Sequence, residues 1–225
     1  MRHLLTGAGS GIGRALARRL RDRGDELWLV VRDPARLGEE FPDAHVLTAD
    51  LADPSAIEAL ELPESLDSVL HVAGVVDLAP VADLAARQLR EQIDVNLIGP
   101  VLLTKRALPA VRRARGLVLF VNSSAGLSAG ASWSAYAASK FGLRAVADAL
   151  RAEELPHGVR VTTVFPSRTA TPMQEKVHEQ EGGTYDSSRW IRPETVAETI
   201  LHVVDLSPEA TIPEVTIRPL VPRRA

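Results

Sequence analysis

Short apolar runs alternate along this chain with longer segments in which apolar residues recur at helical spacing. The runs predict strands, and the longer segments predict helices with one apolar face. The strands are predicted at residues 2–5, 26–31, 45–48, 67–72, 116–121, 160–165 and 214–218. The helices are predicted at 11–23, 53–60, 87–113, 134–155 and 193–204, with a weaker one after Pro34. This alternation is typical of an α/β protein, a doubly wound parallel sheet of about seven strands with helices on both faces.

The length and composition favour a single domain over residues 1–225. The chain has 225 residues, 45% of them hydrophobic, which suits one α/β domain with a sizeable core. The long polar segment 167–192 is predicted to be a substrate lid within this domain, because long loops in compact domains often cover sites. Its Met173 and Trp190, together with Trp133, form either an apolar substrate wall or anchors that hold the loop to the core.

Charge and composition argue against several other classes. A formal net charge of −3 gives no broad cationic surface, so nucleic acid is not expected as a partner. Cysteine is absent, which excludes disulfides and thiol nucleophiles, and the six histidines show no close ligand pairing, so no metal is expected. No apolar run approaches the roughly 20 residues of a membrane span, and the first strand begins directly after Met1 without a leader. We therefore expect a cytoplasmic protein without a membrane partner.

The segment Thr6-Gly7-Ala8-Gly9-Ser10-Gly11-Ile12-Gly13 joins the first predicted strand to the first predicted helix. Glycines permit backbone angles and close approaches that a side chain would block, and the free amides at the start of a helix attract phosphate oxygens. A dinucleotide pyrophosphate therefore fits this turn, although glycine-rich turns also occur as plain connectors.

Tyr136 and Lys140 are four residues apart, which on a helix puts both side chains on one face. An ammonium group at that distance favours the phenolate and could bring the pKa of the tyrosine, ordinarily about 10, toward neutral pH. The pair could thus exchange protons with a substrate. The alternative is a partly buried aromatic residue beside a solvated lysine.

The order and spacing of several motifs resemble those of the classical short-chain dehydrogenase/reductase family. T-G-x-x-x-G-x-G is matched by the glycine-rich turn, Y-x-x-x-K by the pair just described, and the family's serine by Ser123, thirteen positions before the tyrosine. Asp50-Leu51, Ala73-Gly74 and Asn96 match further family positions, and the resemblance covers nearly the whole chain.

The resemblance implies a Rossmann fold, an oxidoreductase activity and a set of site residues. The implied catalytic residues are Asn96, Ser123, Tyr136 and Lys140, with Tyr136 as proton donor or acceptor, Ser123 bound to the substrate oxygen, and Asn96 holding a water that links Lys140 to solvent. The implied cofactor-binding residues are Thr6, Gly7, Gly9, Ser10, Gly11, Ile12, Gly13, Arg32, Asp50, Leu51, Ala73, Gly74, Tyr136, Lys140, Pro166 and Thr171.

Three positions depart from the family pattern. His71 and Val72 replace the two asparagines of N-N-A-G, and Ser167 replaces the glycine of P-G after the sixth strand. We expect His71 to be buried and hydrogen-bonded rather than catalytic. The changes leave the reaction class intact but put the geometry of the cofactor in question.

The choice of cofactor depends on Arg32 and Asp33 at the end of the second predicted strand. A carboxylate there binds the ribose 2′-hydroxyl of NAD, whereas an arginine accommodates the 2′-phosphate of NADP. By resemblance the acidic position falls on Val31 and the phosphate-binding position on Arg32, so NADP is favoured over NAD. Alternatively, Arg32 and Asp33 merely begin a solvated loop.

The resemblance implies hydride transfer between NADP(H) and a carbonyl compound or secondary alcohol, for which we expect a small or medium-sized substrate. A non-catalytic NADP(H)-binding sensor or scaffold and an epimerase or dehydratase are the alternatives. The resemblance also implies a homodimer or homotetramer that pairs the helices at 87–113 and 134–155. Apolar side chains such as Leu102, Leu103, Leu143, Val146 and Leu150 would suit this contact, and they would also suit ordinary packing on the sheet, which takes one face of each helix.

Overall fold

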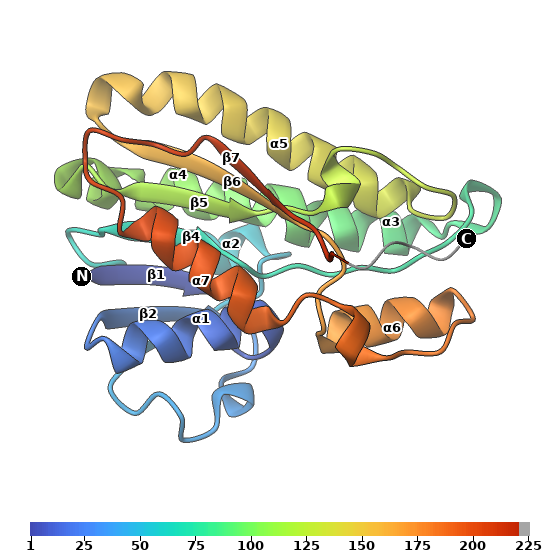
Figure 1. Cartoon of the computed structure of the whole chain (residues 1–225). Helices are drawn as coiled ribbons and strands as arrows, with labels where there is room; N and C mark the ends of the chain where they lie inside the picture. Colours follow the sequence, from blue (N-terminus) through green and yellow to red (C-terminus); the bar gives the residue numbers. More distant parts are fainter. Residues whose placement is uncertain (221–225) are drawn as a thin grey trace.

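The computed structural model describes residues 1–220, so the last five residues of the predicted domain lie outside it. Within that range, seven strands form one parallel sheet in the order β3-β2-β1-β4-β5-β6-β7 (Figure 1). The strands are β1 (Arg2–Thr6), β2 (Glu26–Val31), β3 (His45–Thr48), β4 (Ser68–His71), β5 (Leu117–Val121), β6 (Arg160–Pro166) and β7 (Glu214–Ile217). The predicted doubly wound α/β fold is confirmed.

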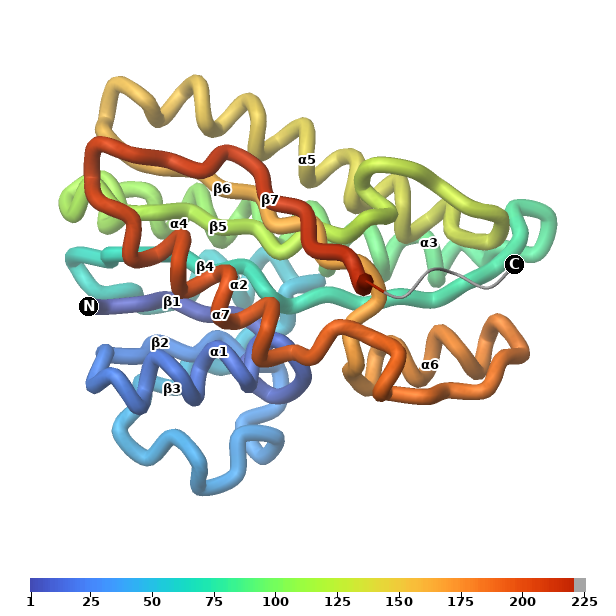
Figure 2. The backbone as a smooth tube through the Cα atoms, in the orientation of Figure 1, coloured from blue at the N-terminus to red at the C-terminus, as the bar shows by residue number. Residues whose placement is uncertain are grey.

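Helices cover both faces of the sheet, which explains why its central strands carry apolar residues on both sides. Helices α1 (Gly11–Asp22) and α7 (Pro193–Val204) pack on one face, and α2 (Pro54–Glu58), α4 (Gly99–Ala114) and α5 (Ser134–Glu154) pack on the other (Figure 2). Every residue of β5 is buried between the two layers.

The strand order reverses between β1 and β4, because the chain moves outward from β1 to β3 and then returns to the other side of β1. Thr6 at the end of β1 pairs with His71 of β4, which in turn pairs with Phe120 of β5. The carboxyl ends of these strands are therefore level. In doubly wound sheets, ligands bind beyond the strand ends at such a point of reversal.

The single helix predicted at 87–113 is divided in the structure. It consists of α3 (Ala86–Ile93), a π-helical turn (Asp94–Ile98) and α4. Gly99 follows the turn, and a Cβ atom there would lie 2.4 Å from the carbonyl oxygen of Leu51. This close approach fixes the chain at the break, and single π turns often occur at functional sites.

The segment 167–192, predicted as a loop, contains α6 (Pro172–Gln180), which Figure 1 shows beyond the carboxyl ends of the strands. The helix forms because residues at its N-terminus cap it. The Thr171 hydroxyl accepts the amide of Gln174 at 3.3 Å, and Pro172 occupies the first turn, where a missing N–H costs nothing.

Of the two alternatives for the apolar side chains of α4 and α5, packing on the sheet applies to three of them. Leu103, Leu143 and Leu150 lie in the core beneath the sheet and are not exposed. Their side of each helix packs on the strands, as the helical periodicity requires. The large apolar side chains exposed near that face are Ile98 and Phe141. Within residues 1–220, no helix is both long and apolar enough to cross a bilayer.

Candidate active site

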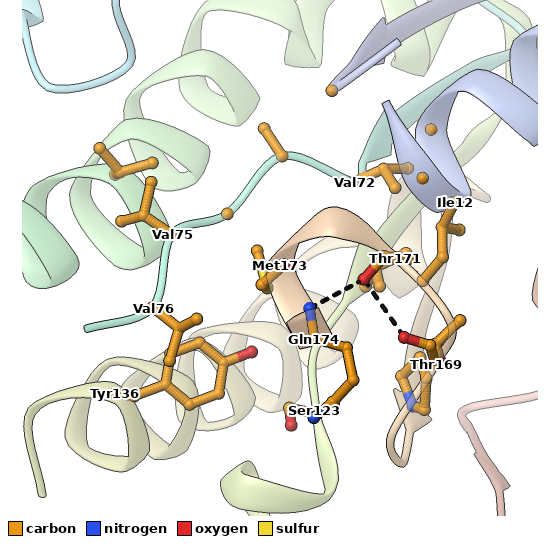
Figure 3. A pocket seen from close by; sticks show the side chains of 18 of the residues that line it. Ile12, Val72, Val75, Val76, Ser123, Tyr136, Thr169, Thr171, Met173 and Gln174 are labelled. Atoms are coloured by element: carbon orange, nitrogen blue, oxygen red, sulfur yellow. Dashed lines mark hydrogen bonds between the residues drawn. The ribbon is translucent and has the colours of Figure 1, made fainter. Parts of the chain in front are cut away.

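A cavity of about 630 Å³ lies at the carboxyl ends of the strands and extends from the glycine-rich turn to Tyr136. All of the predicted site residues line it except Thr6 and Asn96, which lie behind its wall. The structure thus brings together residues that are up to 164 positions apart, as Gly7 and Thr171 are. Figure 3 shows part of this lining, with the Tyr136 hydroxyl facing the cavity and Ser123 beside it.

The glycine-rich turn brings backbone close to backbone, and its Ser10 amide donates a long hydrogen bond of 3.5 Å to the Gly7 carbonyl oxygen. Gly7 has φ +83, and a Cβ atom there would lie 2.8 Å from the amide nitrogen of Ala73. A Cβ atom on Gly13 would lie 2.1 Å from the Gly7 carbonyl oxygen. Ser10 makes no side-chain capping bond, and the first turn of α1 carries no acidic residue. The start of α1 therefore suits an anion such as a pyrophosphate.

Thr6 precedes this turn at the end of β1 and does not line the cavity. Its hydroxyl oxygen accepts the amides of Val72 and Ala73, both at 3.1 Å, and the residue is 1% exposed. Thr6 thereby ties the end of β1 to the segment that follows β4.

Two guanidinium groups and one acid lie near the end of β2. Arg32 has a 65% exposed side chain that lies 3.9 Å from Asp50. The Asp33 carboxylate accepts the amide of Ala35 at 3.0 Å and caps the turn Pro34–Leu37, so it has a structural role. Arg36 also lines the cavity, and its Cβ would lie 3.3 Å from a Cβ on Gly9. The sequence analysis missed Arg36 because the turn that presents it has no motif of its own.

Tyr136 is 7% exposed, and its environment differs from the expected one. Burial raises the pKa of Tyr136 to about 12, and a hydrogen bond with Ser123 acts in the opposite direction. The pKa of Tyr136 is therefore not brought toward neutral pH as expected, because burial disfavours the charged phenolate more than its neighbours favour it.

Lys140 is 3% exposed and has no carboxylate partner in residues 1–220. Its Nζ atom donates a hydrogen bond to the Val121 carbonyl oxygen at 3.1 Å and lies 5.8 Å from the centre of the Tyr136 ring. Burial lowers the pKa of Lys140 from 10.5 to about 8. The ammonium group is therefore still the main form at neutral pH.

Asn96 lies in the π-helical turn and is fully buried. Its side chain binds the backbone of Val75 in both directions, because Oδ1 accepts the Val75 amide and Nδ2 donates to the Val75 carbonyl oxygen, each at 2.8 Å. Nδ2 also donates to the Ser139 hydroxyl at 3.1 Å. Asn96 thus fixes a segment of the cavity wall, and its role with a water molecule stays a prediction.

Asn122 is a site residue that the sequence analysis missed. Its Oδ1 accepts the Ser123 amide at 2.8 Å, and its Nδ2 donates to the Lys140 carbonyl oxygen at 2.9 Å. A Cβ atom on Gly126 would lie 2.3 Å from Oδ1, which explains the glycine three positions after Ser123. The only available signal was a polar residue at the end of a buried strand.

Other contacts replace the side-chain hydrogen bonds that asparagines at positions 71 and 72 would make. His71 is buried, hydrogen-bonded to the Thr104 hydroxyl at 2.8 Å and stacked on Phe120 at 4.9 Å, so the expectation for it is confirmed. Burial, with a smaller contribution from the Lys140 charge, lowers its pKa to about 3. Val72 needs no side-chain bond, because its amide is held by Thr6.

The far end of the cavity is mainly apolar. Trp133 and Met173 line it together with Val76 and Val177. The Trp190 side chain instead packs against His178, with ring centres 5.2 Å apart. The apolar side chains were expected either to form a substrate wall or to anchor the segment. Trp133 and Met173 belong to the wall, and Trp190 anchors the segment.

Comparisons with known proteins agree with this geometry. The sequence profile of the family described as short chain dehydrogenase matches residues 2–182. The uncharacterized short-chain type dehydrogenase/reductase y4eK of Sinorhizobium fredii is 30% identical over 223 residues, covering 96% of this chain and 90% of its own.

Solved structures share the fold. An alcohol dehydrogenase from the archaeon Thermococcus sibiricus, complexed with 5-hydroxy-NADP, aligns with a TM-score of 0.86 at 23% identity, over 100% of this chain and 98% of its own. The closed form of a serine dehydrogenase complexed with NADP+ aligns with a TM-score of 0.89 at 24% identity, over 100% and 97%. With the profile match over most of its length, the chain belongs to the short-chain dehydrogenase/reductase family of oxidoreductases.

Proposed function

We propose that the protein transfers hydride between NADP(H) and a small or medium-sized neutral carbonyl compound or secondary alcohol, with Tyr136 as proton donor or acceptor. The observation that carries the proposal is the convergence of Tyr136, Ser123 and Lys140 on the cavity that begins at the uncapped start of α1. A phenol, a hydroxyl and an ammonium group at a nucleotide site are what carbonyl reduction requires.

The residues present fit a dinucleotide. The glycine-rich turn leaves no room for side chains where a pyrophosphate would lie, and the free amides of α1 point to the same place. Gly74 lies at the other end, where a Cβ atom would come within 3.2 Å of the Oδ1 atom of Asn96, a tight contact. When bound, the nicotinamide supplies or accepts the hydride.

Three side chains bind the substrate oxygen and transfer the proton. The Ser123 hydroxyl oxygen accepts the Ala125 amide at 3.1 Å, so the hydroxyl that bonds with Tyr136 here can turn its hydrogen to a substrate oxygen. The raised pKa of Tyr136 keeps the phenol protonated at neutral pH, and its proton is available to that oxygen during reduction. The Lys140 ammonium group stabilises the phenolate that remains.

The preference for NADP rests on the residues at the end of β2. Arg32 and Arg36 both face the cavity, whereas the Asp33 carboxylate is engaged by the amide of Ala35. A guanidinium group pairs well with a ribose phosphate. The complexes of the two similar structures with NADP compounds support the same choice.

We also infer that 167–192 acts as a substrate lid. Its helix α6 is held to the segment after β4 through Asp77, whose carboxylate accepts hydrogen bonds from Gln180 and, at 2.9 Å, from Gln88, and lies 3.5 Å from the Nζ atom of Lys176. Lys176 also donates to the Val76 carbonyl oxygen at 3.0 Å. These contacts join α6 to the chain at and beside Val76, which lines the apolar end.

The test is a panel of neutral ketones and aldehydes with NADPH, and of the matching alcohols with NADP+, together with the melting shift caused by each nucleotide. The Tyr136→Phe variant should lose roughly 100-fold or more of its turnover, as expected for a missing general acid, and should still bind NADPH. Substantial residual turnover would contradict the role of Tyr136. A wild-type protein that binds NADPH but reduces nothing would favour the sensor or scaffold alternative.

A further inference from the structure

The Gln174 side chain lies on the cavity side of α6. It is 7% exposed and lines the cavity near Trp133, Met173 and Val177. In Figure 3 it extends from α6 toward Ser123, on the side of the cavity to which the Tyr136 hydroxyl points. A polar amide therefore stands within the apolar end, close to the proposed position of the reacting carbonyl group.

His178 determines which end of this amide faces the cavity. The Nδ1 atom of His178 lies 2.9 Å from the Gln174 carbonyl oxygen and 2.9 Å from the Gln174 side-chain amide. A carbonyl oxygen can only accept, so Nδ1 must carry a hydrogen. A protonated Nδ1 cannot accept from the NH₂ group, and both contacts are favourable only when the amide oxygen faces Nδ1.

In that orientation the NH₂ group of Gln174 takes the other position of the amide. That position has no hydrogen-bond partner among residues 1–220 and is not sealed inside the protein. Gln174 lines the cavity and its side chain extends toward Ser123, which directs the end of the amide to the space for the substrate (Figure 3). A donor in an apolar, mostly buried wall is favourable only when an acceptor binds to it.

The orientation of His178 is itself fixed by the aromatic residues of the same segment. The His178 ring is 7% exposed and lies between Tyr185 and Trp190, with ring centres 5.4 Å and 5.2 Å away. These two rings therefore act on the cavity indirectly, by holding the histidine that holds the amide.

We propose that Gln174 is a specificity-determining residue that donates a hydrogen bond to a second acceptor on the substrate, and that His178 is the positioning residue that presents its NH₂ group. The substrate class is then a carbonyl compound with a further uncharged oxygen, such as a hydroxy, alkoxy or second keto group, near the reacting carbon. This inference rests on the proposed function, because it takes the reacting carbon to lie at Tyr136 and Ser123.

Binding of matched ketones to the protein loaded with NADP+ tests the inference without turnover. Methoxyacetone and 2-pentanone have the same shape and differ by an ether oxygen in place of a methylene group, and the pair one methylene longer provides a second spacing. Calorimetry gives the ratio of their dissociation constants. In Gln174→Met, which keeps the length of the side chain, the ratio should shift about tenfold toward the ketone without the ether, the size of one lost hydrogen bond.

A second pair of variants tests the role of His178. His178→Phe keeps a ring between Tyr185 and Trp190 but removes Nδ1, so the ratio should shift in the same direction. The double variant should shift no further than Gln174→Met alone. The matched control is Glu179→Met, an exposed position on the same helix, whose ratio should equal that of the wild type.

The outcomes separate the two proposals. An unchanged ratio in Gln174→Met for both pairs, or no binding of any of these ketones to the wild type, overturns the assignment of Gln174. Independent, additive shifts in the double variant overturn the role of His178. Ratios that shift as described in a protein that reduces none of the ketones with NADPH leave the Gln174 assignment standing and refute the proposed function.

Discussion

The Nζ atom of Lys140 lies 5.8 Å from the centre of the Tyr136 ring, and both residues are almost fully buried. Their positions bring an ammonium group and a phenol together as the four-residue spacing predicted, yet neither group has its ordinary acidity. Burial raises the pKa of Tyr136 to about 12 and lowers that of Lys140 to about 8. The pair is therefore held in the protonated phenol form at neutral pH, at a cost in stability for the lysine.

That cost gives the first prediction. Burial lowers the pKa of Lys140 from 10.5 to about 8, so the folded state disfavours the charged lysine below pH 8. At roughly 1.4 kcal/mol for each tenfold change in the acid dissociation constant, this lowers the free energy of unfolding by up to about 3 kcal/mol. Lys140→Met should therefore unfold at a higher denaturant concentration at pH 7 while losing activity. The free energy of unfolding of the wild type should rise by the same amount between about pH 8 and about pH 10.5, because the unfolded chain has also lost the proton at the upper end of this range.

Urea titrations at pH 7 and pH 10 measure this difference. The matched control is Lys105→Met on the exposed side of α4, which should show no such dependence on pH. A Lys140→Met protein that is less stable than the wild type at pH 7 would mean that the Val121 hydrogen bond outweighs the burial of the charge.

The second prediction concerns the choice of cofactor. Arg32→Asp should lower kcat/KM for NADPH relative to NADH by at least about tenfold, because a carboxylate would repel the ribose phosphate that the guanidinium group attracts. Steady-state kinetics with both cofactors measure the ratio. Arg87→Asp is the control, since Arg87 is 82% exposed on α3 and outside the cavity. Equal losses for the two cofactors would count against the assignment of Arg32.

The third prediction concerns the attachment of α6. Burial alone would raise the pKa of Asp77, but the hydrogen bonds from Gln88 and Gln180 and the Lys176 charge lower it overall. Asp77→Asn should accelerate hydrogen exchange across 172–180 by about tenfold, as the loss of a hydrogen bond to a charged group implies. Because the folded pKa of Asp77 is lowered, the wild type should show the same acceleration only as pH falls through that pKa.

Mass spectrometry resolves the exchange of α6 from that of the sheet. Asp83→Asn, an exposed acid in the same connection, serves as the control. Exchange across 172–180 that is identical in Asp77→Asn and the wild type would refute the attachment.

The fourth prediction follows from His71. Its pKa is lowered from 6.5 to about 3 by burial, so the unfolded chain binds a proton below pH 6.5 that the folded protein does not. The free energy of unfolding should therefore fall with acidification, by about 3 kcal/mol between pH 7 and pH 4. His71→Gln, which can still bind Thr104, should lack this part of the loss. His202→Gln at an exposed position should retain it.

The sequence predicted the features that depend on short stretches of chain. The turn before α1 could be recognised because φ +83 at Gly7 and the close contact at Gly13 demand glycines at fixed positions. The five inner strands could be recognised because buried parallel strands are apolar on both faces.

The parts that the sequence did not predict depend on distant contacts. The pKa of Tyr136 follows from burial by the whole site, not from the spacing to Lys140. Asn122 matters because it joins Ser123 to a helix eighteen residues further along the chain. The role of Gln174 requires His178, Tyr185 and Trp190 to be packed together, which no motif encodes.

The Thr6 hydroxyl accepts two hydrogen bonds from backbone amides, and these bonds connect the glycine-rich turn to the segment after β4. One hydroxyl joins the strand that leads into the phosphate turn to the segment that leads toward Lys140 and Asn96. Removing that single oxygen atom would loosen both of these segments at once, although Thr6 itself does not line the cavity.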